Sequence, residues 1–129
     1  MFRLLMIEDD AMMRHMFVKT MTHEGFEVLA EGTLSLGGQT AREKKPDLIL
    51  LDVHLPDGNG IEFCAKLKAD PMLRHIPVLL LSGEATDVSC RVDGIEAGAE
   101  DYVTKPFDHR ELVSRIKNLL RSASGPTLK

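Results

Sequence analysis

Cysteines and long apolar runs are both scarce in this chain of 129 residues. The only cysteines, Cys64 and Cys90, have neither the spacing of a zinc site nor the number needed for a disulfide framework. We therefore predict a reducing compartment, the cytoplasm. No apolar stretch approaches the roughly 20 residues of a membrane-spanning helix. Residues 1–7 are too few for a secretory signal and run directly into acids, so we expect no membrane partner.

Basic residues are also in deficit, with 16 Lys and Arg against 20 Asp and Glu and a formal net charge of -4. A nucleic-acid-binding surface needs a basic face, because it must neutralise phosphates. The acidic balance therefore argues against nucleic acid as a direct partner. The hydrophobic content of 43% and the charged content of 28% are ordinary for one globular domain of common size.

Apolar strand-like runs alternate with helix-like stretches along the chain. We expect strands at 2–7, 26–30, 48–51, 78–81 and 101–104, and helices at 10–24, 33–44, 59–69, 85–97 and after Asp108. Such alternation predicts a doubly wound α/β fold, a parallel sheet joined by right-handed helical crossovers. The runs 48–51 and 78–81 are apolar on both faces, as central parallel strands are.

Two of the expected helices carry informative residues. In the first helix, the spacing i, i+3, i+4 and i+8 predicts a buried stripe of Met13, Met16, Phe17 and Met21. In the second, Gly37-Gly38 weakens the prediction, because each glycine costs a helix about 1 kcal/mol.

Residues with reactive side chains follow four of the expected strands, where each strand gives way to a loop. They are Glu8-Asp9-Asp10, Asp52, Ser82 and Lys105-Pro106. In an open α/β sheet the carboxyl ends of the strands lie side by side and form the ligand crevice. Carboxylates, a hydroxyl and an ammonium that converge there suit a divalent cation and a phosphoryl group.

The acids have two possible roles. Glu8, Asp9 and Asp52 offer the hard oxygen ligands that Mg²⁺ prefers. Acids at a helix start also favour the helix dipole, a role that we assign to Asp10. For Glu8 and Asp9 on their own the two interpretations are equally good, and only the addition of Asp52 and Lys105 favours the metal.

Asp52 is a candidate nucleophile, since carboxylates form aspartyl-phosphates. Phosphoryl transfer mainly needs positioning and neutralised charge, which Lys105 and a cation would supply. The Ser82 hydroxyl would donate a hydrogen bond. Each residue alone has an ordinary interpretation, as a cap, a turn residue or a solvated charge, and their joint placement favours the reactive one. The tertiary amide before Pro106 also permits a cis bond.

These residues resemble the receiver domain of bacterial two-component response regulators. The resemblance covers residues 2 to about 121 and rests on the segments 5–10, 50–60, 81–83 and 102–107. It implies a flavodoxin-like (βα)5 three-layer sandwich, with a parallel five-stranded sheet of order 2-1-3-4-5. We expect a receiver domain over 1–122 and a flexible tail or truncated linker over 123–129.

The resemblance also implies a phosphoacceptor and a metal site. Asp52 would accept a phosphoryl group from a phosphohistidine of a sensor histidine kinase or a histidine phosphotransfer protein. Mg²⁺, for which Mn²⁺ or Ca²⁺ would substitute, would be bound by Asp9, Asp52 and the backbone carbonyl of His54. Glu8 would act through water.

Further roles follow from the same resemblance. Lys105 and Ser82 would hold the phosphoryl oxygens, with a cis bond between Lys105 and Pro106. Ser82 and Tyr102 would be the switch pair, the ring turning inward on phosphorylation. That movement would change the partner affinity of the face made by the fourth helix, fifth strand and fifth helix, while the first helix would dock the phosphodonor. The plainer alternative for Tyr102 is an amphipathic ring at a half-buried edge.

The lifetime of the phosphoryl group would depend on His54 and Glu84, which lie two residues beyond Asp52 and Ser82; the direction of their effect stays open. The protein would be no enzyme in the usual sense, although it would catalyse its own phosphoryl transfer and autodephosphorylation. We expect a monomer or a phosphorylation-dependent homodimer.

Two other functions compete with this one. A phosphatase of the haloacid dehalogenase type would want a second acid two residues after its nucleophile, where this chain has His54. A flavin-phosphate module would place a phosphate beside carboxylates that repel it. The length of the sequence favours a single-domain regulator that works by docking over a fragment of a longer protein.

Overall fold

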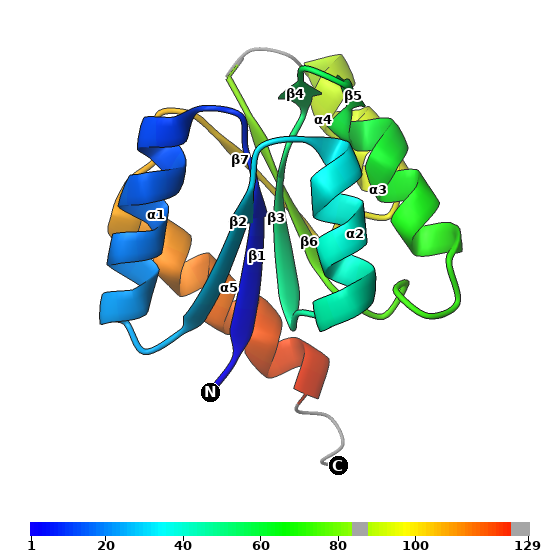
Figure 1. Ribbon diagram of the computed structural model, residues 1–129. Coiled ribbons are helices and arrows are strands. Elements are labelled where there is room, and N and C mark those ends of the chain that lie inside the picture. Colours follow the sequence, from blue (N-terminus) through cyan, green and yellow to red (C-terminus); the bar gives the residue numbers. More distant parts are fainter. Residues whose placement is uncertain (84–87, 125–129) are drawn as a thin grey trace.

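The computed structural model describes residues 1–83 and 88–124, and apart from two short extra strands after the third its strands and helices alternate as the sequence predicts (Figure 1). Glu84 and the residues after 124 lie outside the described part. The elements are β1 (Arg3–Ile7), α1 (Ala11–His23), β2 (Glu27–Glu31), α2 (Leu34–Lys44), β3 (Leu48–Asp52), β4 (His54–Leu55), β5 (Gly58–Asn59), α3 (Gly60–Ala69), β6 (Val78–Ser82), α4 (Val88–Glu96), β7 (Asp101–Thr104) and α5 (His109–Ser124).

Five of these strands form one parallel sheet in the order β2-β1-β3-β6-β7. Counted within that sheet the order is 2-1-3-4-5, which confirms the predicted fold class. The register pairs Ile7 with Leu51, Asp52 with Leu81 and Ser82 with Thr104. The carboxyl ends of the four strands β1, β3, β6 and β7 therefore reach the same edge of the sheet.

Helices cover both faces of the sheet, which gives three layers (Figure 1). One core contains buried side chains of α2 and α3, among them Leu34, Ala41 and Cys64. The other contains buried side chains of α1 and α5, among them Phe17 and Ile116. All residues of β3 and β6 are buried, as expected for central strands with helices on both sides.

The buried stripe expected for the first helix is wrong at Met16, whose side chain is 48% exposed. Phe17 and Met21 are buried and hold α1 against the sheet. Met16 instead lines a pocket between α1 and the segment before α5, which also includes Met12 and Phe107. The spacing of apolar residues along a helix does not distinguish a side chain that lines a surface groove from one that is buried in the core.

The segment between β3 and α3 contains two short strands that are not among those expected from the sequence. His54 pairs with Asn59 and Leu55 pairs with Gly58, so the segment forms a short antiparallel hairpin, β4–β5. Pairing of two residues on each side is too short to leave a periodic pattern.

None of the helices in the described part of the chain has both the length and the apolar content that a bilayer crossing requires.

Candidate functional site

Four strand ends bring the predicted site residues to one edge of the sheet. Glu8 follows β1, Asp52 ends β3, Ser82 ends β6 and Lys105 follows β7. Backbone hydrogen bonds continue the sheet past its last paired residues: Val53 N donates to Leu81 O at 2.9 Å, and Lys105 N donates to Ser82 O at 2.6 Å. These backbone hydrogen bonds therefore fix the positions of the strand ends from which the site side chains extend into the crevice.

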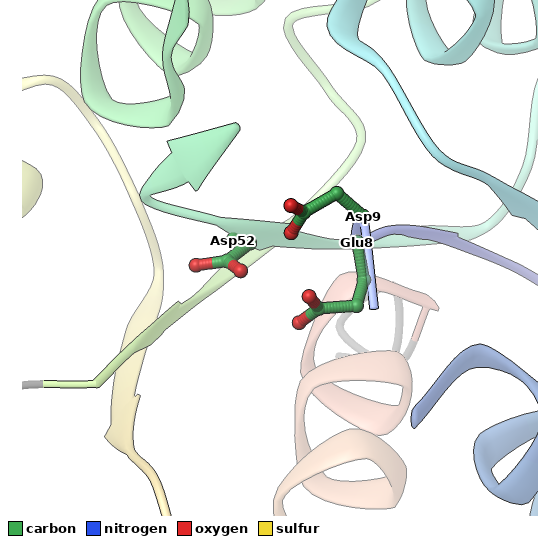
Figure 2. A group of neighbouring side chains, drawn as sticks. All are labelled: Glu8, Asp9 and Asp52. Atoms are coloured by element: carbon green, nitrogen blue, oxygen red, sulfur yellow. The ribbon is translucent and has the colours of Figure 1, made fainter. Parts of the chain in front are cut away.

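Three carboxylates gather at this edge (Figure 2). One oxygen from each of Glu8, Asp9 and Asp52 lies within 4.8 Å of the others. Glu8 and Asp52 are buried, at 1% and 5% exposure, whereas Asp9 is exposed. The donor set contains only hard oxygens and opens to solvent on the Asp9 side. It therefore fits a cation such as Mg²⁺, which keeps several waters and takes one or two carboxylates.

The Lys105 ammonium lies between the two buried acids. Its Nζ donates to Glu8 Oε1 at 2.8 Å and to Asp52 Oδ2 at 3.0 Å. Burial alone would lower the pKa of Lys105, but the hydrogen bonds to Glu8 and Asp52 and the charges of these acids outweigh it, so the pKa is raised. Three carboxylates against one ammonium leave two negative charges in the crevice, a surplus that a divalent cation would neutralise.

The remaining oxygens of these acids are held by the nearby backbone. Glu8 Oε2 accepts from Asp10 N at 3.0 Å, and Asp52 Oδ1 accepts from His54 N at 3.2 Å. Asp10 is the N-cap of α1 and accepts from Met12 N and Met13 N, as predicted. Asp10 thus caps α1, whereas Glu8 and Asp9 belong to the carboxylate cluster of the cation site.

Sequence reasoning missed one residue that supports the acids. Arg14, on α1, donates from Nη1 to the backbone carbonyl of Glu8 at 2.7 Å. Its guanidinium also lies against Gly32, so it joins α1, the end of β1 and the loop after β2. A basic residue on a helix carries no local signal of such a contact.

The other predicted site residues lie around the same edge. Ser82 is 1% exposed, and the peptide bond between Lys105 and Pro106 is cis. Tyr102 is 5% exposed, so its ring is buried in the core, with the Arg91 guanidinium 5.5 Å from the ring centroid. The His54 side chain is exposed, and Glu84 lies outside the described residues.

Known proteins resemble this chain along nearly its whole length. A family model for the response regulator receiver domain matches residues 4–117. PhoB of Escherichia coli, a phosphate regulon transcriptional regulatory protein, is 44% identical over 124 residues, which are 95% of this chain and 53% of PhoB. MtrA of Mycobacterium leprae, a DNA-binding response regulator, is 41% identical over 121 residues, 92% of this chain and 51% of MtrA.

A solved structure agrees with these matches. The crystal structure of a CheY-like response regulator receiver domain protein from Methanospirillum hungatei has a TM-score of 0.89 and 27% identity, and the match covers 95% of this chain and 96% of that one. The chain spans about half the length of the curated relatives.

The relatives overturn one expectation. MtrA is by name a DNA-binding protein, so the exclusion of nucleic acid as a direct partner, drawn from the net charge, is wrong. The net charge of one domain reports only on that domain, and the matched segment is about half of MtrA. The family match over residues 4–117 and the identities to PhoB and MtrA show that this chain belongs to the response regulator receiver domains.

Proposed function

We propose that this chain is the phosphorylation-switched receiver of a two-component system. Asp52 accepts a phosphoryl group from a phosphohistidine on a sensor histidine kinase or a histidine phosphotransfer protein. The observation that carries the proposal is the position of Lys105 Nζ, 2.8 Å from Glu8 and 3.0 Å from Asp52 beside a cluster of three carboxylates. A buried nucleophile, an ammonium and a cation site in one crevice are the parts that phosphoryl transfer needs.

In the transfer step a carboxylate oxygen of Asp52 forms the new P–O bond while the P–N bond to the donor imidazole breaks. The imidazole leaves with the electron pair of that bond. Lys105 neutralises charge on the phosphoryl oxygens, and the Ser82 hydroxyl donates a hydrogen bond to one of them. The protein thus catalyses its own phosphorylation, and attack of water on the same phosphorus later reverses it.

The cation of this reaction is Mg²⁺, with Mn²⁺ or Ca²⁺ as substitutes. Asp9, Asp52 and the His54 backbone carbonyl would hold it directly, and Glu8 through water. When bound, it supplies positive charge beside the phosphoryl oxygens. His54 and Glu84 would tune the phosphoryl lifetime, and the exposure of the His54 imidazole is compatible with a position on the path of the attacking water.

The donor would dock on α1 beside the crevice. Met12 is 72% exposed and Met16 is 48% exposed, and both line an apolar pocket with Phe107. Exposed methionines adapt well to the side chains of a partner, because the thioether chain is flexible and polarizable. This apolar surface supports a docking role for α1.

The switch would run from Ser82 through Tyr102 to the face made by α4, β7 and α5, the fourth helix, fifth sheet strand and fifth helix. Val92 and Ile95 on α4 are exposed at 47% and 51%, and Arg115 on α5 is partly exposed. Exposed apolar side chains together with charged ones suit protein contact. We infer that this face binds a downstream protein or a second copy of the chain once Asp52 is phosphorylated.

PhoB is by name a transcriptional regulatory protein and MtrA a DNA-binding response regulator, so we infer that the switch governs transcription. The cytoplasm remains the predicted compartment. The division into a receiver over 1–122 and a tail over 123–129 also remains a prediction; α5 extends to Ser124.

A small phosphodonor tests the acceptor. We expect the purified protein to gain one phosphoryl group from acetyl phosphate when Mg²⁺ is present, detected by intact mass, and Asp52→Asn to gain none. Asp93→Asn, the same chemical change at an exposed position on α4, is the matched control and should react like the parent protein. Incorporation that persists in Asp52→Asn would reject Asp52, and turnover of phosphomonoesters would favour a phosphatase instead.

A further inference from the structure

Asp57 lies at the tip of the β4–β5 hairpin and bonds to a different element. Its Oδ1 accepts from Leu34 N at 2.8 Å and its Oδ2 accepts from Ser35 N at 3.0 Å, both in the first turn of α2. These hydrogen bonds lower the pKa of the Asp57 carboxyl. Asp57 is separated from these partners by 23 and 22 residues in the sequence, so the bonds tie two distant segments together.

The bonds complete the capping of α2. The first backbone N–H groups of a helix have no partner within it. In α2 the side-chain hydroxyl of the N-cap residue, Thr33, accepts from Leu36 N at 3.1 Å. The N–H groups of Leu34 and Ser35 are satisfied by Asp57, and α2 has no acid of its own in its first turn. The negative charge that favours this helix start therefore comes from the hairpin.

A second contact lies beside the first. Leu34 is 9% exposed, and its Cδ1 would lie 2.8 Å from a Cβ added at Gly58, so the leucine packs directly over the hairpin backbone. Gly58 has a φ of +156°, which side-chain-bearing residues rarely adopt. The hairpin tip is thus held on α2 by two hydrogen bonds and one apolar contact.

The other end of the hairpin is at the crevice. His54 begins β4, and its N–H donates to the Asp52 carboxylate at 3.2 Å. Two paired residues on each side give little stiffness of their own, since an isolated short hairpin is only marginally stable. The contact of Asp57 with α2 therefore bears directly on where the His54 carbonyl lies.

We propose that Asp57 is a positioning residue for the cation site: its bonds to α2 hold the β4–β5 hairpin and thereby set the position of the His54 carbonyl relative to Asp9 and Asp52. The inference rests on the proposed function, in which that carbonyl is a ligand of Mg²⁺. Groups that orient metal ligands typically change affinity by about 10–100-fold when removed.

The test is the affinity for Mg²⁺, measured by titration calorimetry on the full chain at 0.15 M salt, where remote charges are screened within about 8 Å. We expect Asp57→Ala to raise the Kd by about tenfold, the lower end of that range. Asp57→Asn loses the same charge but keeps one acceptor oxygen, so its Kd should rise clearly less. Phosphorylation of both variants should return to the wild-type rate at saturating Mg²⁺.

Thr33→Ala is the matched control, because it removes a capping bond from the same turn of α2 without touching the hairpin. We expect it to lower the Tm as Asp57→Asn does while leaving the Kd unchanged. Equal losses of affinity in Asp57→Ala and Asp57→Asn would assign the effect to charge, and a loss in Thr33→Ala would assign it to α2 stability. Either result, or an unchanged Kd in both Asp57 variants, overturns the inference.

Failure of the proposed function looks different. A wild-type protein that binds no Mg²⁺ would remove the cation site and this inference with it. A wild-type protein that binds Mg²⁺ and accepts phosphate, with Asp57 variants of equal affinity, would overturn the inference alone.

Discussion

Two regions of this molecule each place one basic side chain between two acids, and they differ in burial. At the crevice the side chain of Lys105 is 21% exposed, and those of Glu8 and Asp52 are 1% and 6% exposed. Removing one partner from such a group leaves a charge buried without compensation.

On the outer face of β7 and α5 the same arrangement is open to water. Arg115 contacts Asp101 at 2.9 Å and Glu111 at 3.0 Å, and its side chain is 39% exposed. Exposed pairs of this kind contribute little, because water and salt screen them. The Arg115 pKa is raised by its hydrogen bonds to Asp101 and Glu111, as the Lys105 pKa is by its own partners, so a raised pKa alone does not distinguish a site from a surface ion pair.

The crevice around Lys105 and the surface group around Arg115 do differ in burial and in surplus negative charge. The crevice has a third acid, Asp9, and two of its three acids are buried, so the negative charge that Lys105 leaves uncompensated favours a cation from solution. The surface group is already solvated. We therefore expect loss of the buried Lys105 ammonium to change chemistry and stability together, and loss of the exposed Arg115 guanidinium to change neither strongly.

The largest effect is expected for Lys105→Met. Without Mg²⁺ this change should lower the free energy of unfolding by about 3 kcal/mol, because Glu8 and Asp52 stay buried without their counter-charge. The rate of phosphorylation should fall by at least about 100-fold, as when a preorganised donor is lost from a reaction centre. Urea unfolding and the initial rate with acetyl phosphate measure the two effects, and a variant that keeps the wild-type rate would contradict the role of the amine.

Asp9→Asn should separate metal binding from folding. Because Asp9 is an exposed, direct ligand in the proposed site, its loss should weaken Mg²⁺ binding by more than about tenfold. The same change relieves repulsion among the acids, so the metal-free protein should become more stable, by less than about 1 kcal/mol. Thermal unfolding with and without Mg²⁺ shows both effects; a variant that Mg²⁺ stabilises as strongly as the parent would argue against Asp9 as a ligand.

Arg115→Met is the surface counterpart of Lys105→Met. We expect it to lower the free energy of unfolding by no more than about 1 kcal/mol and to leave phosphorylation by acetyl phosphate unchanged. Urea unfolding and the initial rate of phosphorylation are again the measurements. A loss comparable to that of the lysine variant would show that burial is not what separates the two groups.

The smallest expected effect concerns pH. A raised Lys105 pKa means that the ammonium stabilises the fold fully below the ordinary value of 10.5 and loses this effect only as the pH rises through the higher folded value. The difference in unfolding free energy between the parent and Lys105→Met should therefore stay constant from about pH 8 to 10. Burial raises the Cys64 pKa to about 11, but this thiol is common to both proteins and cancels. A difference that grows with pH over this range would mean that burial outweighs the acids and lowers the Lys105 pKa, because the unfolded chain would then bind more protons than the folded one.

Much of the fold could be predicted, because its strongest signals are local. The apolar runs at 48–51 and 78–81 mark strands with helices on both sides, and β3 and β6 lie there. The convergence of Glu8, Asp52 and Lys105 followed from the rule that parallel strands end at one edge. The same rule assigns no role to any of them, and those roles stay predictions.

Contacts between elements could not be predicted. Gly37-Gly38 looked like a weakness in a helix, yet a Cβ at Gly37 would collide with the Ile7 side chain, so the glycine lets α2 approach β1 closely. The bonds of Asp57 to α2 and of Arg14 to the Glu8 carbonyl likewise depend on which elements pack together. The residue pattern within one segment carries no information about contacts between two segments that are distant in the sequence.

The most direct test of the central claim is to locate the phosphoryl group. Borohydride reduces an acyl phosphate to an alcohol, so treatment after reaction with acetyl phosphate converts the modified aspartate to homoserine, which peptide mass spectrometry can place. We predict homoserine at residue 52 alone, and only when Mg²⁺ is present. Homoserine at residue 9 or 10, or at residue 52 without any divalent cation, would contradict the account.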